Sequence, residues 1–282
     1  EVKNLNIGVI GAGTMGRGIA EVAAIAGFHT AIFDTDGGVL DSAIDHLDST
    51  TGENIRLIRR ADSIQDATER SDVVIEAVTE LIAAKADVLQ AVVESATDST
   101  TVCSNTSTIS IDRLAEHVSF PHNFLGMHFF NPVRRMRLVE IVQGSATSDT
   151  AVQTVVNLAH QMDKTPIVVM DSPGFASSRL GVALGNEAMR MVEQGVASIE
   201  DIDTAMRLGY NHPMGPLELA DLVGLDARLN NSRSMYEALG DEQFRPPEML
   251  LRLVAEGRLG RKTSRGFYLY EDGKKTKMSE GV

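Results

Sequence analysis

The stretch NIGVIGAGTMGRGIAEVAAIAGFHTAIFD, residues 6–34, decides the fold of this 282-residue chain. Its apolar start predicts a short strand, and the glycines of GAGTMG follow without a gap. Helically spaced apolar residues run from Met15 to Ala26, and HTAIF predicts a second strand that ends at Asp34. A strand, a glycine turn, a helix, a strand and a terminal acid form the layout of a dinucleotide-binding unit.

The three glycines of the turn have separate physical tasks. Gly11 permits the tight turn, Gly13 lets a pyrophosphate approach the backbone, and Gly16 lets the helix pack on the strand. In isolation such a motif is a weak signal and favours a plain structural turn, but here it stands between a strand and a helix, and Asp34 follows. We therefore predict a cofactor site formed by Gly11, Ala12, Gly13, Thr14, Met15, Gly16 and Asp34.

Asp34 indicates which dinucleotide binds. A carboxylate at this position accepts hydrogen bonds from ribose hydroxyls and repels a 2′-phosphate. The following residues, Thr35 to Gly37, offer no arginine that would bind such a phosphate. The sequence predicts NAD rather than NADP.

Composition excludes several classes of protein. A formal net charge of −13 argues against nucleic acid as a partner, although a local cationic patch for an anionic ligand stays open. The single cysteine, Cys103, supports neither a disulfide framework nor a cysteine-ligated metal site, so we expect no metal and a cytoplasmic protein. No uncharged stretch reaches the roughly 20 residues that span a bilayer, and the start lacks the apolar segment of a signal peptide, so we expect no membrane partner.

The order of the patterns predicts two domains. Up to about residue 170, short β-rich runs alternate with helical stretches at 15–26, 37–60, 81–96 and 151–162, which indicates an α/β, Rossmann-like, mainly parallel doubly wound sheet. The rest carries helix-spaced apolar residues and ends in a polar stretch, EDGKKTKMSEGV, expected to be a frayed tail. We predict an NAD-binding domain at 1–171 and an all-α domain at 172–282. The expected strands are NIGVI, HTAIF, DVVIEAV, TTVCSNT, FLGMHFF, LVEIVQG and PIVVM.

Polar residues in apolar strands mark a candidate catalytic site. His128 lies between FLGM and two phenylalanines, an apolar setting in which its pKa would suit proton transfer. The alternative is a structural histidine of the core whose ring nitrogens are hydrogen-bonded, which is typical of an isolated histidine among apolar residues. Glu140 lies in the apolar run LVEIV, where a carboxylate is costly unless it is paired, so an adjacent strand is expected to bring it to the imidazole. The alternative for Glu140 is an outward-facing strand residue.

With these motifs in view, the chain resembles the L-3-hydroxyacyl-CoA dehydrogenases, particularly the bacterial 3-hydroxybutyryl-CoA dehydrogenases. The resemblance covers nearly the whole chain. It rests on GAGTMGRGIA, VIEAVTELIAAK, SNTSTISI, GMHFFNPV, LVEIV, SPGF, HPMGPLELADLVGLD and GRKTSRGFYLY.

The resemblance implies an oxidoreductase of fatty acid metabolism that transfers a hydride between C3 of a 3-hydroxyacyl-CoA and NAD. His128 would be the general base or acid, Glu140 would orient it, and Ser107 and Asn131 would contact the substrate. Glu80 and Lys85 would lie near the nicotinamide ribose and phosphates, although both are also compatible with solvated charges at a helix start. The resemblance also implies a homodimer formed through the C-terminal helical domain, whose apolar faces are otherwise explained as internal core.

The chain departs from the family's pattern at three places that concern substrate binding. Ser178 replaces a recurrent active-site asparagine after PGF, and its shorter side chain would make a water-mediated contact with the substrate. The stretch after Asp34 is shorter than the family's helical hairpin, which helps to hold CoA. Arg134, Arg135 and Arg137 follow the catalytic segment and would meet CoA phosphates, or form a solvated charged turn.

Two rival functions remain open from the sequence. One is an NAD-dependent dehydrogenase of a free hydroxy acid or sugar acid, similar to the lambda-crystallin-like gulonate dehydrogenases. The other is a non-catalytic cofactor-binding protein that keeps the fold. The motifs HFFNP and HPMGPLELAD argue against the first, and the joint presence of His128, Glu140, Ser107 and Asn131 argues against the second.

Overall fold

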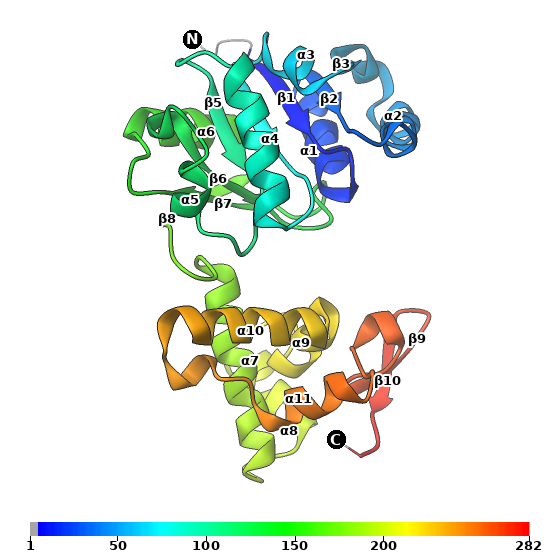
Figure 1. Cartoon of the computed structure of the whole chain (residues 1–282). Helices are drawn as coiled ribbons and strands as arrows, with labels where there is room; N and C mark the ends of the chain where they lie inside the picture. Colours follow the sequence, from blue (N-terminus) through cyan, green and yellow to red (C-terminus); the bar gives the residue numbers. More distant parts are fainter. Residues whose placement is uncertain (1–4, 282) are drawn as a thin grey trace. The chain divides into compact units, whose positions relative to one another are not determined.

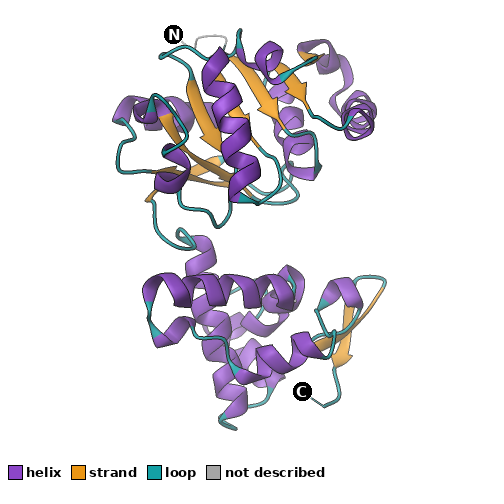
Figure 2. Cartoon of the chain, in the orientation of Figure 1, coloured by secondary structure: helices purple, strands orange, loops and turns teal. Residues whose placement is uncertain are grey.

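The computed structural model describes residues 5–281, which divide into two compact units, residues 5–175 and 176–281 (Figure 1). The first unit contains an eight-stranded sheet with helices on both faces (Figure 2). The second unit is mainly helical. The predicted Rossmann-like α/β class with a helical C-terminal part is therefore confirmed.

The strands of the first unit are hydrogen-bonded in the order β3-β2-β1-β4-β5-β6-β7-β8. The six strands from β1 to β6 are parallel, whereas β7 runs antiparallel to β6 and parallel to β8. Their bounds are β1 (Asn6–Ile10), β2 (His29–Phe33), β3 (Ile58–Arg60), β4 (Val73–Glu76), β5 (Thr101–Ser104), β6 (Phe124–Phe129), β7 (Leu138–Gln143) and β8 (Thr165–Met170).

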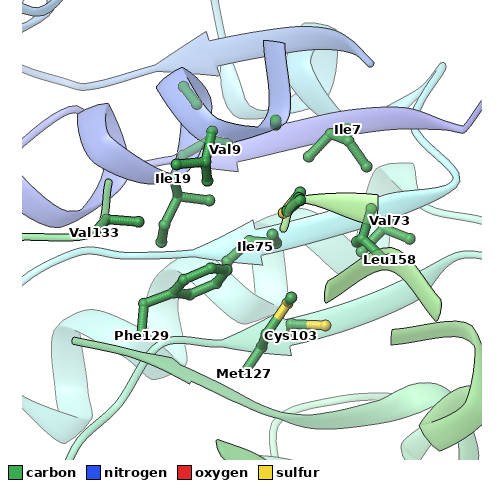
Figure 3. Packing of buried hydrophobic residues seen from close by; sticks show 14 of the residues in the cluster. Ile7, Val9, Ile19, Val73, Ile75, Cys103, Met127, Phe129, Val133 and Leu158 are labelled. Carbon is green, nitrogen blue, oxygen red and sulfur yellow. The ribbon is translucent and has the colours of Figure 1, made fainter. Parts of the chain in front are cut away.

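Helices cover both faces of the sheet because its strands are apolar on both sides. Alternate residues such as Ile7 and Val9 of β1, and Val73 and Ile75 of β4, point into one core, which helix α1 covers with Ile19 (Figure 3). Ile10 of β1 and Val74 of β4 face a second core under α4. The helices are α1 (Thr14–Ile25), α2 (Gly37–Thr51), α3 (Ile64–Thr68), α4 (Ile82–Ser95), α5 (Ile111–Ala115) and α6 (Asp149–Gln161), with short 3-10 helices η1 (Gly52–Leu57) and η2 (Pro121–Asn123).

The expected helix at 37–60 was wrong in its second half. Helix α2 ends at Thr51, Gly52 follows with a φ of +58°, and the chain continues through η1 into β3. Strand β3 is only three residues long and pairs with one neighbour, β2. A strand this short is too short to show an apolar pattern in the sequence. The segment after Asp34 thus contains one long helix and an edge strand.

The second unit corrects the expectation of an all-α domain. Its polar tail was expected to fray, but Lys274–Met278 forms strand β10 and pairs with β9 (Tyr268–Glu271). The turn between the strands uses Asp272 and Gly273, both with positive φ. The remaining elements are α7 (Ser177–Glu193), α8 (Ile199–Thr204), the π-helical turn η3 (Ala205–Gly209), α9 (Pro216–Val223), α10 (Leu225–Leu239), η4 (Glu242–Phe244), α11 (Glu248–Ala255) and η5 (Arg261–Thr263).

A buried aspartate holds the hairpin of the second unit in place. Asp221 accepts hydrogen bonds from the backbone N–H groups of Phe267 and Tyr268, at 3.0 and 2.9 Å, and from the hydroxyl of Tyr270 at 3.0 Å. Burial raises the pKa of Asp221 to about 6. No helix in residues 5–281 is long and apolar enough to cross a bilayer.

Candidate active site

The glycine turn lies at the carboxyl end of β1 and leads into α1. Gly11 has a φ of +99°, and a Cβ atom there would lie 2.7 Å from the carbonyl oxygen of Ala77. A Cβ atom on Gly16 would lie 1.7 Å from the carbonyl oxygen of Gly11, whereas one on Gly13 would meet no atom within 4 Å. The protein's own packing therefore requires glycine at two positions, and the backbone at Gly13 stays open to a ligand.

Asp34 connects the second strand to this turn. Its Oδ2 accepts a hydrogen bond from the Ala12 N–H at 2.7 Å, and its Oδ1 accepts one from the Asp36 N–H at 2.9 Å. The carboxylate is only partly buried, so its remaining lone pairs face accessible space. Asp34 is thus placed beside the glycine turn, as a ribose-binding acid requires.

Two hollows share Gly13 in their linings. One, of about 350 Å³, is lined by Gly11, Asp34 and Val78 among others, and the second, of about 370 Å³, is lined by Thr14 and Arg17 among others. Helix α1 begins after Gly13 without a side-chain cap, so its first N–H groups are available to an anion. Thr14 is exposed and Met15 half-buried in the first turn of this helix.

A buried ion pair lies under the end of β4. Lys85 of α4 is 1% exposed, and its Nζ donates to Oε1 of Glu76 at 2.8 Å. Glu76 is fully buried and also accepts hydrogen bonds from the Ser104 hydroxyl at 2.6 Å and the Val78 N–H at 2.7 Å. Lys85 is therefore no solvated charge at a helix start, and it ties α4 to β4 and β5.

Glu80 organises the loop after β5. Its Oε1 accepts hydrogen bonds from the hydroxyl of Thr106 at 2.7 Å and from the backbone N–H groups of Ser107 and Thr108 at 2.7 and 2.9 Å. Its Oε2 lies 3.3 Å from Nζ of Lys85. Burial raises the pKa of Glu80, but the hydrogen bond from Thr106 and the charge of Lys85 outweigh it and bring the pKa below its usual value. Glu80 thus remains a carboxylate that fixes the position of Ser107.

His128 and Glu140 face each other across β6 and β7. They are directly opposite in the antiparallel ladder, and Nδ1 of His128 lies 2.9 Å from Oε2 of Glu140. His128 is 7% exposed and Glu140 is fully buried. The rings of Phe130 and Phe175 lie 4.5 and 5.9 Å from the imidazole ring, centre to centre. A buried carboxylate on Nδ1 leaves Nε2 as the nitrogen that can exchange a proton with a ligand.

The ends of β5 and β6 are joined by a residue that the sequence did not single out. The side-chain oxygen of Asn105 accepts a hydrogen bond from the backbone N–H of Phe129 at 2.9 Å, next to His128. Ser107 follows on the same loop, and its hydroxyl also contacts Glu80 at 3.2 Å. Asn131 is exposed in the turn after β6.

The arginines after the histidine segment are largely engaged with other residues. Arg134 donates to Glu21 at 2.7 Å, and Arg137 donates to Asp163 at 3.2 Å. Arg135 is exposed. These contacts favour a charged turn over a cluster that is free for CoA phosphates. Ser178 belongs to the second unit, in the first turn of α7.

Sequence reasoning missed four residues of this region: Arg17, Glu76, Ser104 and Asn105. A signal was present for Glu76, because it is an acid directly after three apolar strand residues, VVI, where a carboxylate requires a partner. No comparable signal marks Arg17, which lines the second hollow together with Asp36.

Known proteins share the fold and align with nearly the whole chain. Residues 6–172 match the family model of the 3-hydroxyacyl-CoA dehydrogenase NAD binding domain, and residues 174–270 match that of the 3-hydroxyacyl-CoA dehydrogenase C-terminal domain. A probable 3-hydroxybutyryl-CoA dehydrogenase of Bacillus subtilis is 40% identical, over 94% of this chain and 96% of its own length. A 3-hydroxybutyryl-CoA dehydrogenase of Clostridioides difficile is 37% identical, over 94% and 99%.

A solved structure agrees with these sequence matches. The crystal structure of (S)-3-hydroxybutyryl-CoA dehydrogenase from Ralstonia eutropha superimposes with a TM-score of 0.90 at 37% identity, covering 96% of this chain and 100% of that one. Both family models and the full-length relatives thus agree on one assignment. The chain belongs to the 3-hydroxyacyl-CoA dehydrogenase family.

Proposed function

We propose that this protein is an NAD-dependent dehydrogenase that interconverts 3-hydroxybutyryl-CoA and acetoacetyl-CoA, with His128 as the general base or acid. The observation that carries the proposal is the buried His128–Glu140 pair at the carboxyl end of β6. Relatives named 3-hydroxybutyryl-CoA dehydrogenase match this chain over nearly its full length, which supports the substrate.

The glycine turn and Asp34 would hold the cofactor. The open backbone at Gly13 and the uncapped start of α1 suit the pyrophosphate, and Asp34 suits the adenosine ribose. We assign Glu80 and Lys85 to the nicotinamide side, where Glu80 also fixes the loop that carries Ser107. When bound, NAD supplies a nicotinamide ring that exchanges a hydride with the substrate.

His128 would move the proton of the reaction. Its Nε2 accepts the proton of the substrate 3-hydroxyl during oxidation and returns it to the 3-oxo group during reduction. Glu140 accepts a hydrogen bond from Nδ1–H, so it fixes the tautomer and stabilises the imidazolium that forms. The flanking rings of Phe130 and Phe175 exclude water from the imidazole and strengthen this interaction.

Three polar residues are assigned to the substrate. Ser107 and Asn131 would hydrogen-bond the oxygen at C3 or the thioester carbonyl, and Ser178 would contribute through a bridging water. We also propose a cytoplasmic homodimer formed through the helical unit. Sedimentation equilibrium checks the dimer, and a monomeric mass at micromolar concentration contradicts it.

Substitution of His128 tests the catalytic assignment. We expect His128→Gln to lower kcat for acetoacetyl-CoA reduction by about 10²- to 10⁴-fold, the usual contribution of a general acid or base. NAD affinity, measured by calorimetry, should change little because no assigned cofactor residue is altered. Glu140→Gln should give a smaller loss and displace the pH–rate profile, since an amide stabilises the imidazolium less.

The control and the alternatives belong to the same assay. His122→Gln alters an exposed histidine of η2 just before β6 and should leave turnover unchanged. NADH oxidation is followed with acetoacetyl-CoA, with free acetoacetate and without substrate. Activity on the free acid alone rejects the CoA substrate, and retention of most activity in His128→Gln removes His128 from the mechanism.

A further inference from the structure

The turn after β6, residues 131–137, carries one of the residues assigned to the substrate. It begins with Asn131, two residues after the end of β6. Asn131 is exposed, and its side chain forms no hydrogen bond with any residue between 5 and 281. The position of this side chain is therefore set by the backbone of the turn alone.

Lys164 holds the turn from the side of β8. It lies directly before this strand and is 5% exposed, and its Nζ donates to the carbonyl oxygens of Val133 at 2.5 Å and Met136 at 3.0 Å. The neighbouring acid, Asp163, pairs with Arg137 instead, at 3.2 Å. In the described part of the chain, the ammonium group of Lys164 thus fixes two backbone carbonyls and forms no ion pair with a carboxylate.

The turn also packs on α1, the helix that follows the glycine turn. Val133 is 3% exposed, and a Cβ atom on Gly18 would lie 2.9 Å from the Cβ atom of Val133. Glycine at this position therefore lets the turn lie directly against the helix. Three residues further along α1, the buried carboxylate of Glu21 accepts a hydrogen bond from Arg134 at 2.7 Å. The turn is thus held between α1 and the start of β8.

We propose that Lys164 is a positioning residue, which holds the turn so that Asn131 keeps its place next to the histidine segment. Without the ammonium group, the carbonyl oxygens of Val133 and Met136 lose their side-chain donor, and the backbone between them is free to shift toward other partners. A shift of about 1 Å in a group that contacts the substrate lowers the rate by about 100-fold. The effect on catalysis rests on the proposed function, whereas the ordering of the turn does not.

The first arm of the test measures the order of the turn by limited trypsin digestion of the native protein. The turn contains three sites of cleavage, Arg134, Arg135 and Arg137. For Lys164→Met we expect cleavage at these sites to be about 10-fold faster than in the wild type, or more, because a lost hydrogen bond raises the population of the open turn. Cleavage after the buried Lys85 reports unfolding of the whole unit and should not change. Lys277→Met, which alters an exposed lysine of β10, is the control and should leave the turn as resistant as in the wild type.

The second arm tests whether Lys164 acts through Asn131. The value of kcat/KM for acetoacetyl-CoA reduction is measured for the wild type, Lys164→Met, Asn131→Ala and the double variant. Lys164→Met should lower it about 10- to 100-fold in the wild-type background. In the Asn131→Ala background the same change should cost at most about threefold, because no side chain is left to position. Lys277→Met should leave kcat/KM unchanged.

A second variant addresses the other attachment of the turn. Glu21→Gln keeps the size of the side chain and weakens its contact with Arg134, so it should change both readouts in the same direction by a smaller factor. It replaces Lys164→Met in both arms if that variant does not fold.

Three results would overturn the proposal. They are unchanged cleavage of the turn, an equal rise of cleavage after Lys85, and strict additivity of the substitutions at 164 and 131. Inactivity of the wild type on acetoacetyl-CoA contradicts the proposed function instead, and the trypsin digestion then still decides whether Lys164 orders the turn.

Discussion

The buried Glu76–Lys85 pair makes a quantitative prediction about the first unit. Lys85→Met removes the cation and keeps most of the aliphatic volume, which leaves the carboxylate of Glu76 fully buried. Removing one partner of such a pair costs about 3–5 kcal/mol. Glu76 keeps the Ser104 hydroxyl and the Val78 N–H as donors, so we expect the lower end, about 3 kcal/mol.

A double-mutant cycle separates the charge pair from the loss of packing. Glu76→Gln removes the negative charge, so combining it with Lys85→Met should cost at least about 1.5 kcal/mol less than the sum of the single changes. Because the chain has no tryptophan, urea unfolding is followed by circular dichroism. Lys262→Met is the control, since that lysine is 49% exposed, and it should cost at most about 1 kcal/mol.

Two results would refute this reasoning. One is a loss below about 1 kcal/mol for Lys85→Met, which would mean that the carboxylate of Glu76 finds solvent or a proton at little cost. The other is strict additivity in the double variant, which would mean that the two side chains contribute separately. Either result would return Lys85 to a role toward the cofactor alone.

Two further predictions concern backbone packing and pH. Gly16→Ala places a Cβ atom within 1.7 Å of the carbonyl oxygen of Gly11, so we expect the unfolding free energy to fall by about 2 kcal/mol or more. Gly13→Ala meets no atom within 4 Å, so it should leave the unfolding free energy unchanged and weaken NAD binding, as measured by calorimetry. Equal stability losses in the two variants would contradict this. The pKa of Asp221 is raised from 3.8 to about 6, so its stabilising contribution is complete below about pH 4 and is lost as pH rises through 6. Asp221 should therefore lower the unfolding free energy of the second unit by about 2–3 kcal/mol between pH 4 and 7. Urea unfolding of Asp221→Asn should show a smaller decrease over this range, to which Asp203 still contributes because burial raises its pKa as well. An identical slope in the variant would exclude Asp221 as a source.

The long strands and the cofactor turn were predictable because their signals are local. Apolar runs of strand length, a glycine turn in direct sequence and an acid at the end of the second strand each act within a few residues. The pairing of His128 with Glu140 was also predictable, since each polar group interrupts an apolar strand and a buried carboxylate requires a partner.

The elements that the sequence did not reveal depend on distant contacts. Strand β3 has three residues and exists by pairing with β2. The sequence of the β9–β10 hairpin looked like a polar tail, although Asp272 and Gly273 signal a turn. The residue that anchors the hairpin, Asp221, lies more than forty residues earlier, so nothing near the hairpin in the sequence indicates that it is held in place. The antiparallel direction of β7 is likewise set by its pairing with β6 and not by the residues of β7 themselves.

The sequence by itself determined the cofactor turn, the α/β class and the family, because hydrophobic period and glycine position are properties of neighbouring residues. Only the tertiary structure decided which charges are buried and with whom they pair. Lys85 and Arg228 look alike in the sequence as cations near helix starts, and both are buried. Lys85 pairs with the buried carboxylate of Glu76, whereas Arg228 forms no ion pair with any residue between 5 and 281, and its Nε has no hydrogen-bond partner there. That difference arises from packing between elements far apart in the chain, which desolvates each charge and supplies or withholds its partner.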